Sequence, residues 1–211
     1  MSQRRGIYFT SDWHVGHANV IKYDKRPFKD VEHMHRVLIN NYNAIVGEGD
    51  VCYFVGDMGL CKFDTLKNIV SQLNGTKILI LGNHDRNMES MYKVGFDVVM
   101  YGAVLWIAKE NVTISHCPMI GAFAEDTTGM KGTEEGDNWY GETRERFQKF
   151  STINNGQFHL HGHSHVGPEN TINGRQYNVN VTCNKYRPVH ISKIESWIAI
   201  TKKAEQENGN S

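Results

Sequence analysis

The chain has 211 residues, of which 39% are hydrophobic and 22% are charged, and its 23 basic and 23 acidic residues give a formal net charge of zero. This composition predicts one globular domain with enough apolar residues for a core. The neutral balance gives no indication of a polyanionic partner such as long duplex nucleic acid, although a local basic patch would not show in it.

The sequence favours a cytoplasmic protein without a membrane partner. None of the four cysteines, Cys52, Cys61, Cys117 and Cys183, is paired in a CxxC motif, which predicts reduced thiols in a reducing compartment. The first 13 residues lack the apolar centre of a secretory signal. No apolar run approaches the length of a transmembrane helix. The sequence does not indicate an oligomeric state.

The first half of the chain alternates short apolar runs with helical patterns, which is typical of βαβ units. Strands are predicted over residues 7–12, 51–57 and 77–85. Helices are predicted over 31–46, 62–73 and 87–94. Asp30 directly precedes the first of these helices and is expected to cap it.

The second half predicts further strands near 97–108 and over 111–118, 157–165 and 175–182. Helices are predicted over 144–150 and 191–203. The glycine-rich, acidic stretch 121–141 lacks a clear period and is expected to form a long loop or a lid. Residues 1–203 are therefore expected to form a single domain, and the polar residues 204–211 a disordered tail.

Five of the apolar runs end in a polar cluster. These clusters are Ser11 to His14, Gly56-Asp57, Gly82 to Asp85, Ser115-His116 and Gly162 to His165. In open α/β sheets, ligands bind outside the carboxyl ends of the strands. The pattern therefore predicts an α/β fold in which the five clusters meet in a single site.

The pooled side chains are those of a transition-metal centre. Two of the aspartates, Asp12 and Asp57, together with one asparagine and five histidines offer oxygen and nitrogen donors but no thiolate. This set favours Mn, Fe, Zn, Ni or Co over a structural zinc site or a calcium cage. About seven ligands, with one or two of them bridging, suit two ions that share a water molecule and leave room for a substrate.

The order of the motifs, DxH, GD, GNHD, H and GHxH, resembles the calcineurin-like metallophosphoesterase superfamily, and the motifs span residues 12 to 165. The resemblance implies two mixed β-sheets packed as a sandwich and flanked by helices. The stretch DWHVGHANVIKYDKRPF is also similar to a group of small bacterial and phage phosphoesterases in that superfamily.

The resemblance also implies a role for each motif residue. Ligands of the first metal would be Asp12, His14 and His165. Ligands of the second would be Asn83, His116 and His163, and Asp57 would bridge the two ions. His84 would be the general acid or a phosphate contact, oriented by Asp85. Manganese is the expected metal.

Several other polar residues have two readings. His17 and Asn19 follow the first motif and are expected either to contact the substrate phosphate or to be solvated. Arg26 could bind phosphate in a bidentate manner, or lie in a solvated loop. His159 and His161 alternate along a strand and are expected in the packing or behind the ligands, rather than on a metal.

The sequence therefore predicts a dinuclear metal-dependent phosphoesterase. The expected substrate is a phosphodiester of a nucleotide, a cyclic nucleotide or a nucleic-acid end, because His84 suits a leaving group that needs a proton. One alternative is a phosphomonoesterase acting on a small phosphorylated metabolite or a protein. The others are a metal-bound scaffold without catalysis and a hydrolase of non-phosphate esters.

Overall fold

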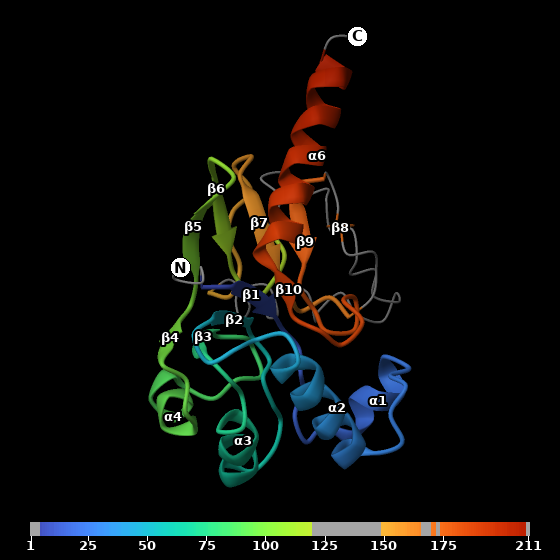
Figure 1. Cartoon of the computed structure of the whole chain (residues 1–211), viewed down its shortest axis with the longest axis vertical. Helices are drawn as coiled ribbons and strands as arrows, with labels where there is room; N and C mark the ends of the chain where they lie inside the picture. The colour runs from blue at the N-terminus through green and yellow to red at the C-terminus, as the bar shows by residue number, and fades with distance from the viewer. Residues whose placement is uncertain (1–4, 120–148, 166–169, 172–173, 210–211) are drawn as a thin grey trace, which may run out of the picture.

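The computed structural model describes residues 5–119, 149–165, 170–171 and 174–209. These residues form two five-stranded sheets and five helices, in agreement with the predicted α/β class (Figure 1). The expected loop 121–141 lies outside the described residues, as does most of the helix expected over 144–150. Of that helix only residues 149–150 are described, and they form a turn.

The first sheet has the strand order β10-β1-β2-β3-β4. Its strands are β1 (Ile7–Thr10), β2 (Val51–Val55), β3 (Thr76–Ile80), β4 (Val98–Met100) and β10 (Val189–His190). Strands β1 to β4 are parallel, and only β10 runs antiparallel. The carboxyl ends of β1, β2 and β3 therefore lie along one edge. The two-residue strand β10 was not predicted, because it is too short to show a period.

The helices connect these parallel strands. Helices α1 (Ala18–Tyr23) and α2 (Val31–Asn43) follow β1, α3 (Phe63–Val70) follows β2, and α4 (Met88–Val94) follows β3. The predicted cap of α2 is confirmed, because the Asp30 side chain accepts a hydrogen bond of 2.7 Å from the His33 N–H. Helix α1 was not predicted, since its six residues bury only Val20.

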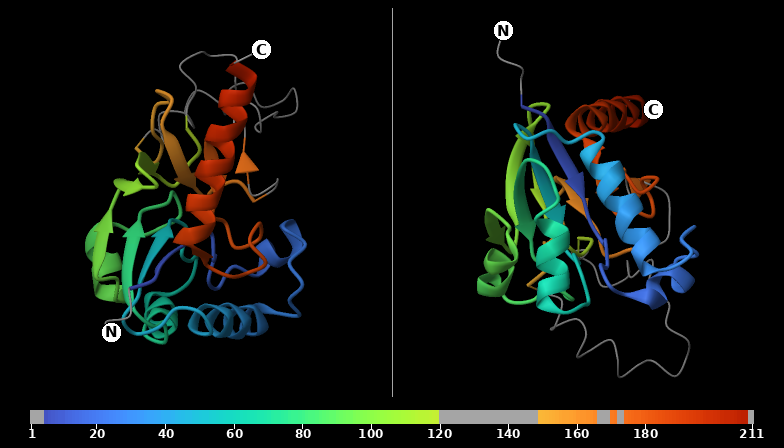
Figure 2. Two further views of the ribbon diagram at one scale, coloured as in Figure 1. Left: turned by 45° about the horizontal axis from the view of Figure 1, so that its top comes forward. Right: turned by 60° about the horizontal axis from the view of Figure 1, so that its bottom comes forward.

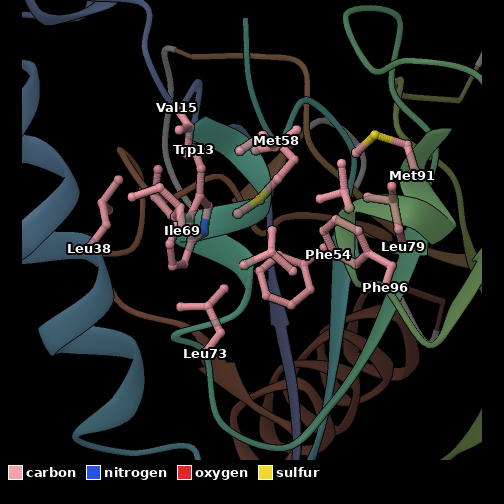
Figure 3. Close-up of a cluster of buried hydrophobic side chains, with 14 of the residues drawn as sticks. Trp13, Val15, Leu38, Phe54, Met58, Ile69, Leu73, Leu79, Met91 and Phe96 are labelled. Carbon is pink, nitrogen blue, oxygen red and sulfur yellow. The ribbon is translucent and has the colours of Figure 1, made fainter. Parts of the chain in front are cut away.

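The first hydrophobic core lies between the first sheet and its helices (Figure 3). Leu38 of α2 and Ile69 of α3 pack in the same cluster as Phe54 and Leu79 of the sheet. Trp13, only 1% exposed, packs there too, and its indole N–H donates to the Thr10 hydroxyl at 2.9 Å. Burying each such side chain contributes about 1.5–3 kcal/mol. The loop after β1 is therefore anchored in the core at Trp13, between Asp12 and His14.

The second sheet has the strand order β5-β6-β7-β9-β8. Its strands are β5 (Ala103–Ile107), β6 (Glu110–Ile114), β7 (Phe158–His161), β8 (Asn170–Thr171) and β9 (Gln176–Asn178). Strands β6, β7 and β9 are parallel, while β5 and β8 pair antiparallel at the two edges. The carboxyl ends of β6 and β7 therefore also share one edge of their sheet.

A second hydrophobic core contains residues from both sheets. Phe9 and Ile80 of the first sheet share this cluster with Ile114 and Leu160 of the second, and all four are fully buried. The cluster also includes Trp197 of α6 (Ile191–Gly209), the long helix that rises beside the second sheet in Figures 1 and 2. Within the described residues, none of the helices is both long and apolar enough to span a bilayer.

Helix α6 is longer than predicted. It continues to Gly209, so residues 204–209 are helical rather than part of a disordered tail. The residues there, AEQE followed by Asn and Gly, are mostly strong helix formers. Glu205 also pairs with Arg175, because Nε and one terminal nitrogen of the guanidinium each lie 2.6 Å from a carboxylate oxygen. This bidentate contact ties the polar end of the helix to the second sheet.

Candidate metal centre

The five polar clusters lie in loops just beyond the strands, because the strands end earlier than predicted. Strand β1 ends at Thr10, β2 at Val55 and β3 at Ile80. Four predicted ligands then adopt a left-handed backbone, with φ of 58° at Asp12, 51° at His14, 55° at Asp57 and 64° at His163. Residues other than glycine seldom adopt this conformation, and it persists where the surrounding structure enforces it.

The loops after β1 and β2 run side by side. The Asp12 N–H donates to the Gly56 carbonyl at 3.0 Å, and the His14 N–H donates to the Asp57 carbonyl at 3.1 Å. Beside the other sheet, the Gly162 N–H donates to the His116 carbonyl at 2.8 Å. Backbone hydrogen bonds thus extend the pairing of the strands into the loops that carry the polar side chains.

Asp85 holds two of these loops together. Its carboxylate accepts hydrogen bonds from the backbone N–H groups of Gly82 at 2.8 Å, Asp57 at 3.0 Å and Met58 at 2.8 Å. Burial, followed by the charge of Asp57, raises the pKa of Asp85 to about 6. The sequence predicts that Asp85 orients the His84 ring. Its carboxylate instead bonds to the backbone, and so fixes the chain on either side of the site.

The first ligand cluster consists of Asp12, His14 and His165. Nε2 of His165 lies 3.3 Å from Oδ1 of Asp12 and 3.0 Å from Nε2 of His14. Nε2 of His14 lies 3.9 Å from the same carboxylate oxygen. One donor atom from each residue falls within 4.8 Å of the others, which suits a single metal ion between them.

The second ligand cluster consists of Asn83, His116 and His163. The side-chain oxygen of Asn83 lies 3.0 Å from Nε2 of His116 and 3.0 Å from Nδ1 of His163. Nδ1 of His116 lies 2.8 Å from the Val55 carbonyl, which fixes a proton on Nδ1 and leaves Nε2 to face the cluster. Cys117 also lies within reach of His116 and His163, although burial raises the pKa of its thiol to about 12.

Asp57 lies between the two clusters. One of its carboxylate oxygens is 3.8 Å from Nε2 of His14, and the other is 3.4 Å from Nε2 of His116. Asp57 also forms a group of candidate ligands with Asp12 and His116. The positions of these side chains therefore suit two cations with the Asp57 carboxylate between them.

The charges of the site act on one another. Burial lowers the pKa of His14 and of His163 to about 4, so both imidazoles are neutral near pH 7. Burial alone would also lower the pKa of His116 and His165, but Asp57 raises the first to about 9, and hydrogen bonds to Asp12 and Asp24 raise the second to about 10. The buried carboxylates are thus stabilised as anions by imidazolium groups, which a divalent cation would replace.

His84 lies at the solvent side of this cluster. Its side chain is 46% exposed, and its Nε2 is 4.0 Å from a carboxylate oxygen of Asp57. Its backbone N–H donates to the other Asp57 oxygen at 2.9 Å, and its ring meets that of His14 edge to face at 5.7 Å. The imidazole is therefore held next to both candidate metal positions while remaining open to a substrate.

The three expected substrate contacts have different positions. The His17 ring lies 5.9 Å from that of His14, and Asn19 is exposed on α1. Arg26 is instead buried, and it donates hydrogen bonds to the carbonyls of Asp12 at 2.9 Å and Trp13 at 3.1 Å. The prediction that Arg26 contacts the phosphate is therefore wrong, because its guanidinium supports the first ligand loop from behind.

An asparagine network that was not predicted lies next to the GHSH loop. The side-chain amides of Asn178 and Asn180 donate to the Ser164 carbonyl, at 2.7 Å and 3.3 Å. Asn184 in turn donates to the carbonyls of Asn178 at 2.9 Å and Asn180 at 2.8 Å. The only signal in the sequence was the repeated asparagine in NVNVTCN, of which residues 178–182 belong to a predicted strand. The network holds Ser164 between the candidate ligands His163 and His165.

His159 and His161 are buried, as expected of residues in the packing. Nε2 of His159 lies 2.8 Å from the Ser115 hydroxyl, and the Nδ1 atom of His161 lies 2.8 Å from the Gly162 carbonyl. The two rings stack with their centroids 5.6 Å apart. They stand behind the loops that carry His116 and His163.

We expect the Gly162→Ala substitution to disturb the first ligand cluster. A Cβ at this position would overlap the Asp12 carboxylate and lie 2.9 Å from the Ser11 Cβ. Overpacking of this kind costs about 1–3 kcal/mol. Thermal unfolding and Mn²⁺ titration should show lower stability and weaker binding. Gly49→Ala is the matched control, because a Cβ there meets nothing within 4 Å, and equal behaviour of the two variants would contradict the prediction.

Comparison with known proteins identifies proteins of similar sequence, but it does not assign an activity to this chain. No protein-family model matches the chain. An uncharacterised protein of Methanocaldococcus jannaschii is 40% identical over 118 residues, which is 55% of this chain and 64% of that protein. The match thus spans less than two thirds of that relative. The Gene 66 protein of Mycobacterium phage D29 is 28% identical over 178 residues, covering 75% of this chain and 78% of the phage protein.

Two solved structures are similar to different degrees. A protein of unknown function from Aquifex aeolicus superposes with a TM-score of 0.65 and 25% identity, over 92% of this chain and 99% of that one. The phosphopantetheinyl hydrolase of Mycobacterium tuberculosis gives a TM-score of only 0.39 at 13% identity, over 88% of this chain and 95% of that one. The chain therefore shares its fold with the Aquifex protein over most of its length, and its described residues include histidine and aspartate groups that could bind metal.

Proposed function

We propose that this protein is a dinuclear metal-dependent phosphoesterase of the calcineurin-like type, with its two sheets packed as a sandwich. The observation that supports the proposal is the meeting of seven donor residues from both sheets around Asp57. Each of the seven, counting Asp57 itself, lies within hydrogen-bonding or ion-pair range of at least one other, and together they are Asp12, His14, Asp57, Asn83, His116, His163 and His165.

Each residue of the proposed site would have a distinct role in metal binding or proton transfer. The buried carboxylates of Asp12 and Asp57 would attract the two cations, and the imidazoles and the Asn83 amide would complete their coordination. When bound, two divalent ions supply an activated water and neutralise phosphoryl oxygens. His84 would then give its proton to the departing oxygen, since it is half-exposed beside Asp57.

The donor set also bears on the identity of the metal. Carboxylate, amide and imidazole donors suit Mn²⁺, and they suit Fe, Zn, Ni and Co as well. The substrate we favour is a phosphodiester of a nucleotide, a cyclic nucleotide or a nucleic-acid end, because alkoxide leaving groups need the proton that His84 can supply. We place the reaction in a reducing compartment such as the cytoplasm, because none of the four cysteines, all of which lie in the described residues, forms a disulfide.

Removal and restoration of metal would test this function. The chelated protein is assayed with bis-p-nitrophenyl phosphate and p-nitrophenyl phosphate, before and after addition of Mn²⁺. Turnover of the diester that depends on the metal would support the proposal, and a preference for the monoester would indicate a phosphatase. Stoichiometric metal binding without turnover of either ester would favour a scaffold, and so would contradict the proposal.

Metal should also stabilise the fold. At a free Mn²⁺ concentration of a hundred times Kd, each site contributes about 2.7 kcal/mol. In a chain of this length each kcal/mol raises Tm by about 2–4 °C. We therefore expect two filled sites to raise Tm by about 10–20 °C, and excess chelator to reverse the rise. Calorimetric scans that show the same Tm at every Mn²⁺ concentration would argue against a metal centre.

A further inference from the structure

The first ligand cluster has a partner that neither the motifs nor the comparisons identify. Nδ1 of His165 lies 2.9 Å and 2.8 Å from the two carboxylate oxygens of Asp24, on the side of the ring away from the metal position. The Asp24 side chain is only 5% exposed. A buried carboxylate thus contacts a predicted metal ligand that is 141 residues further along the chain.

Arg26 holds this carboxylate in place. Its Nε lies 3.0 Å and one of its terminal nitrogens 2.9 Å from Oδ2 of Asp24, and its own side chain is fully buried. The other bonds of the guanidinium run to the carbonyls of Asp12 and Trp13. The Thr182 hydroxyl adds a longer contact of 3.4 Å to the same oxygen. Arg26 and Asp24 therefore link the backbone at Asp12 to the ring of His165.

We propose that Asp24 is a positioning residue that holds His165 with its proton on Nδ1, so that Nε2 faces the first metal position. This inference rests on the proposed dinuclear function. An ionised carboxylate can only accept hydrogen bonds, so the nitrogen facing it must carry a proton. The lone pair of the neutral ring is then on Nε2, which lies next to Asp12 and His14.

The two clusters differ in how this proton is fixed. In the second cluster, the Val55 carbonyl sets the proton on Nδ1 of His116, and no substitution of a side chain removes a backbone carbonyl. In the first cluster, the same task falls to the Asp24 side chain. Substitution of Asp24 should therefore weaken the first metal site and leave the second intact.

Asparagine is the most informative replacement. Its oxygen would remain opposite Arg26, since the guanidinium can only donate, and its NH₂ group would take the position of Oδ1 opposite Nδ1 of His165. The Nδ1–H group would then face a donor at the Oδ1 position and keep only the oxygen that it shares with Arg26, without the negative charge that favours a proton on Nδ1. The shape of the side chain and its contact with Arg26 are retained while the charge and one of the two acceptors of Nδ1 are lost.

The first test is Mn²⁺ titration of the full chain, followed by calorimetry and by electron paramagnetic resonance. We expect wild type to bind two ions that show exchange coupling. Asp24→Asn should keep one site at wild-type affinity and weaken the other by about 10–100-fold, which removes the coupling at moderate Mn²⁺ concentrations. Asp30→Asn is the matched control, because it makes the same charge change on the same segment and asparagine also caps a helix.

The outcomes separate this inference from the proposed function. Two tight, coupled ions in Asp24→Asn would overturn the role of Asp24 and leave the dinuclear site standing. A wild-type protein that binds fewer than two ions would instead overturn the proposed function. A merely structural role of Asp24 would lower the unfolding temperature of the metal-free protein without changing the ratio of the two affinities.

A second measurement needs no change to Asp24, and it remains decisive if Asp24→Asn fails to fold. Two-bond ¹H–¹⁵N correlation spectra of the Zn²⁺-loaded protein report which nitrogen of each imidazole carries a proton. The His165 signals are those absent from the spectrum of His165→Gln. We expect a proton on Nδ1 and zinc on Nε2. A proton on Nε2 of His165 would overturn the proposal.

Discussion

Replacement of Asp57 with asparagine is expected to weaken Mn²⁺ binding at both positions and to reduce phosphoesterase turnover to background. The two carboxylate oxygens of Asp57 face different clusters, one towards His14 and the other towards His116. An amide removes the charge and turns one of the oxygens into a donor. Because loss of an outer partner alone weakens metal binding by about 10–100-fold, loss of the shared carboxylate should exceed about 100-fold.

Apart from glycine, asparagine is also the replacement that the backbone best tolerates at this position, where φ is 55°. Loss of the metal can therefore be separated from loss of the fold. Metal content by mass spectrometry and the far-UV circular dichroism spectrum give the two readouts. Asp64→Asn, an exposed residue in α3, makes the same charge change and should behave as wild type. Retention of two bound ions in Asp57→Asn would refute the shared-carboxylate model.

The His84→Ala variant is expected to keep both metal ions and to lose about 10²–10⁴-fold in kcat, the usual contribution of a positioned general acid. The loss should depend on the leaving group. Nitrophenolate departs without a proton, so p-nitrophenyl esters should be affected least. A nucleoside alkoxide needs the proton, so its esters should be affected most.

The informative measurement is kcat for an aryl ester and for a nucleoside ester, compared in wild type and variant. His190→Ala serves as the control, because it removes an exposed histidine on β10, away from the metal centre. An equal loss on both esters would mean that His84 binds the phosphate instead of donating a proton. Loss of metal from His84→Ala would show that the residue supports the ligands.

The sequence was sufficient to predict that these seven residues would lie together, and the reason is physical. Each donor follows an apolar run, and parallel strands bring their carboxyl ends to one edge. The bounds of the strands were less accurate, because the apolar pattern of 77–85 continues past Ile80 into the loop. The Leu81 N–H still donates to the Met100 carbonyl of β4, and from Gly82 on the backbone is held by Asp85.

No comparable sequence pattern marks the residues that support the donors. Asp24 and Arg26 sit in a polar stretch, and the sequence cannot show that Arg26 is buried or that Asp24 meets a histidine 141 residues away. The asparagine network could not be predicted for the same reason. Its alternating Asn and Val residues have the pattern of an ordinary strand, and only the fold brings the amides to the Ser164 carbonyl. Long-range contacts decide these roles, and no local pattern encodes them.

The left-handed backbone at Asp12, His14, Asp57 and His163 restricts how the site could evolve. Asp, Asn and His are the side chains other than glycine that enter this conformation most readily, and they are also oxygen and nitrogen ligands. The left-handed backbone and the need for oxygen or nitrogen donors therefore favour the same few residue types at these positions. A lineage that abandoned the metal could relieve the backbone at each of these positions by mutation to glycine, and its descendants would regain the donor set only by restoring each of the lost side chains.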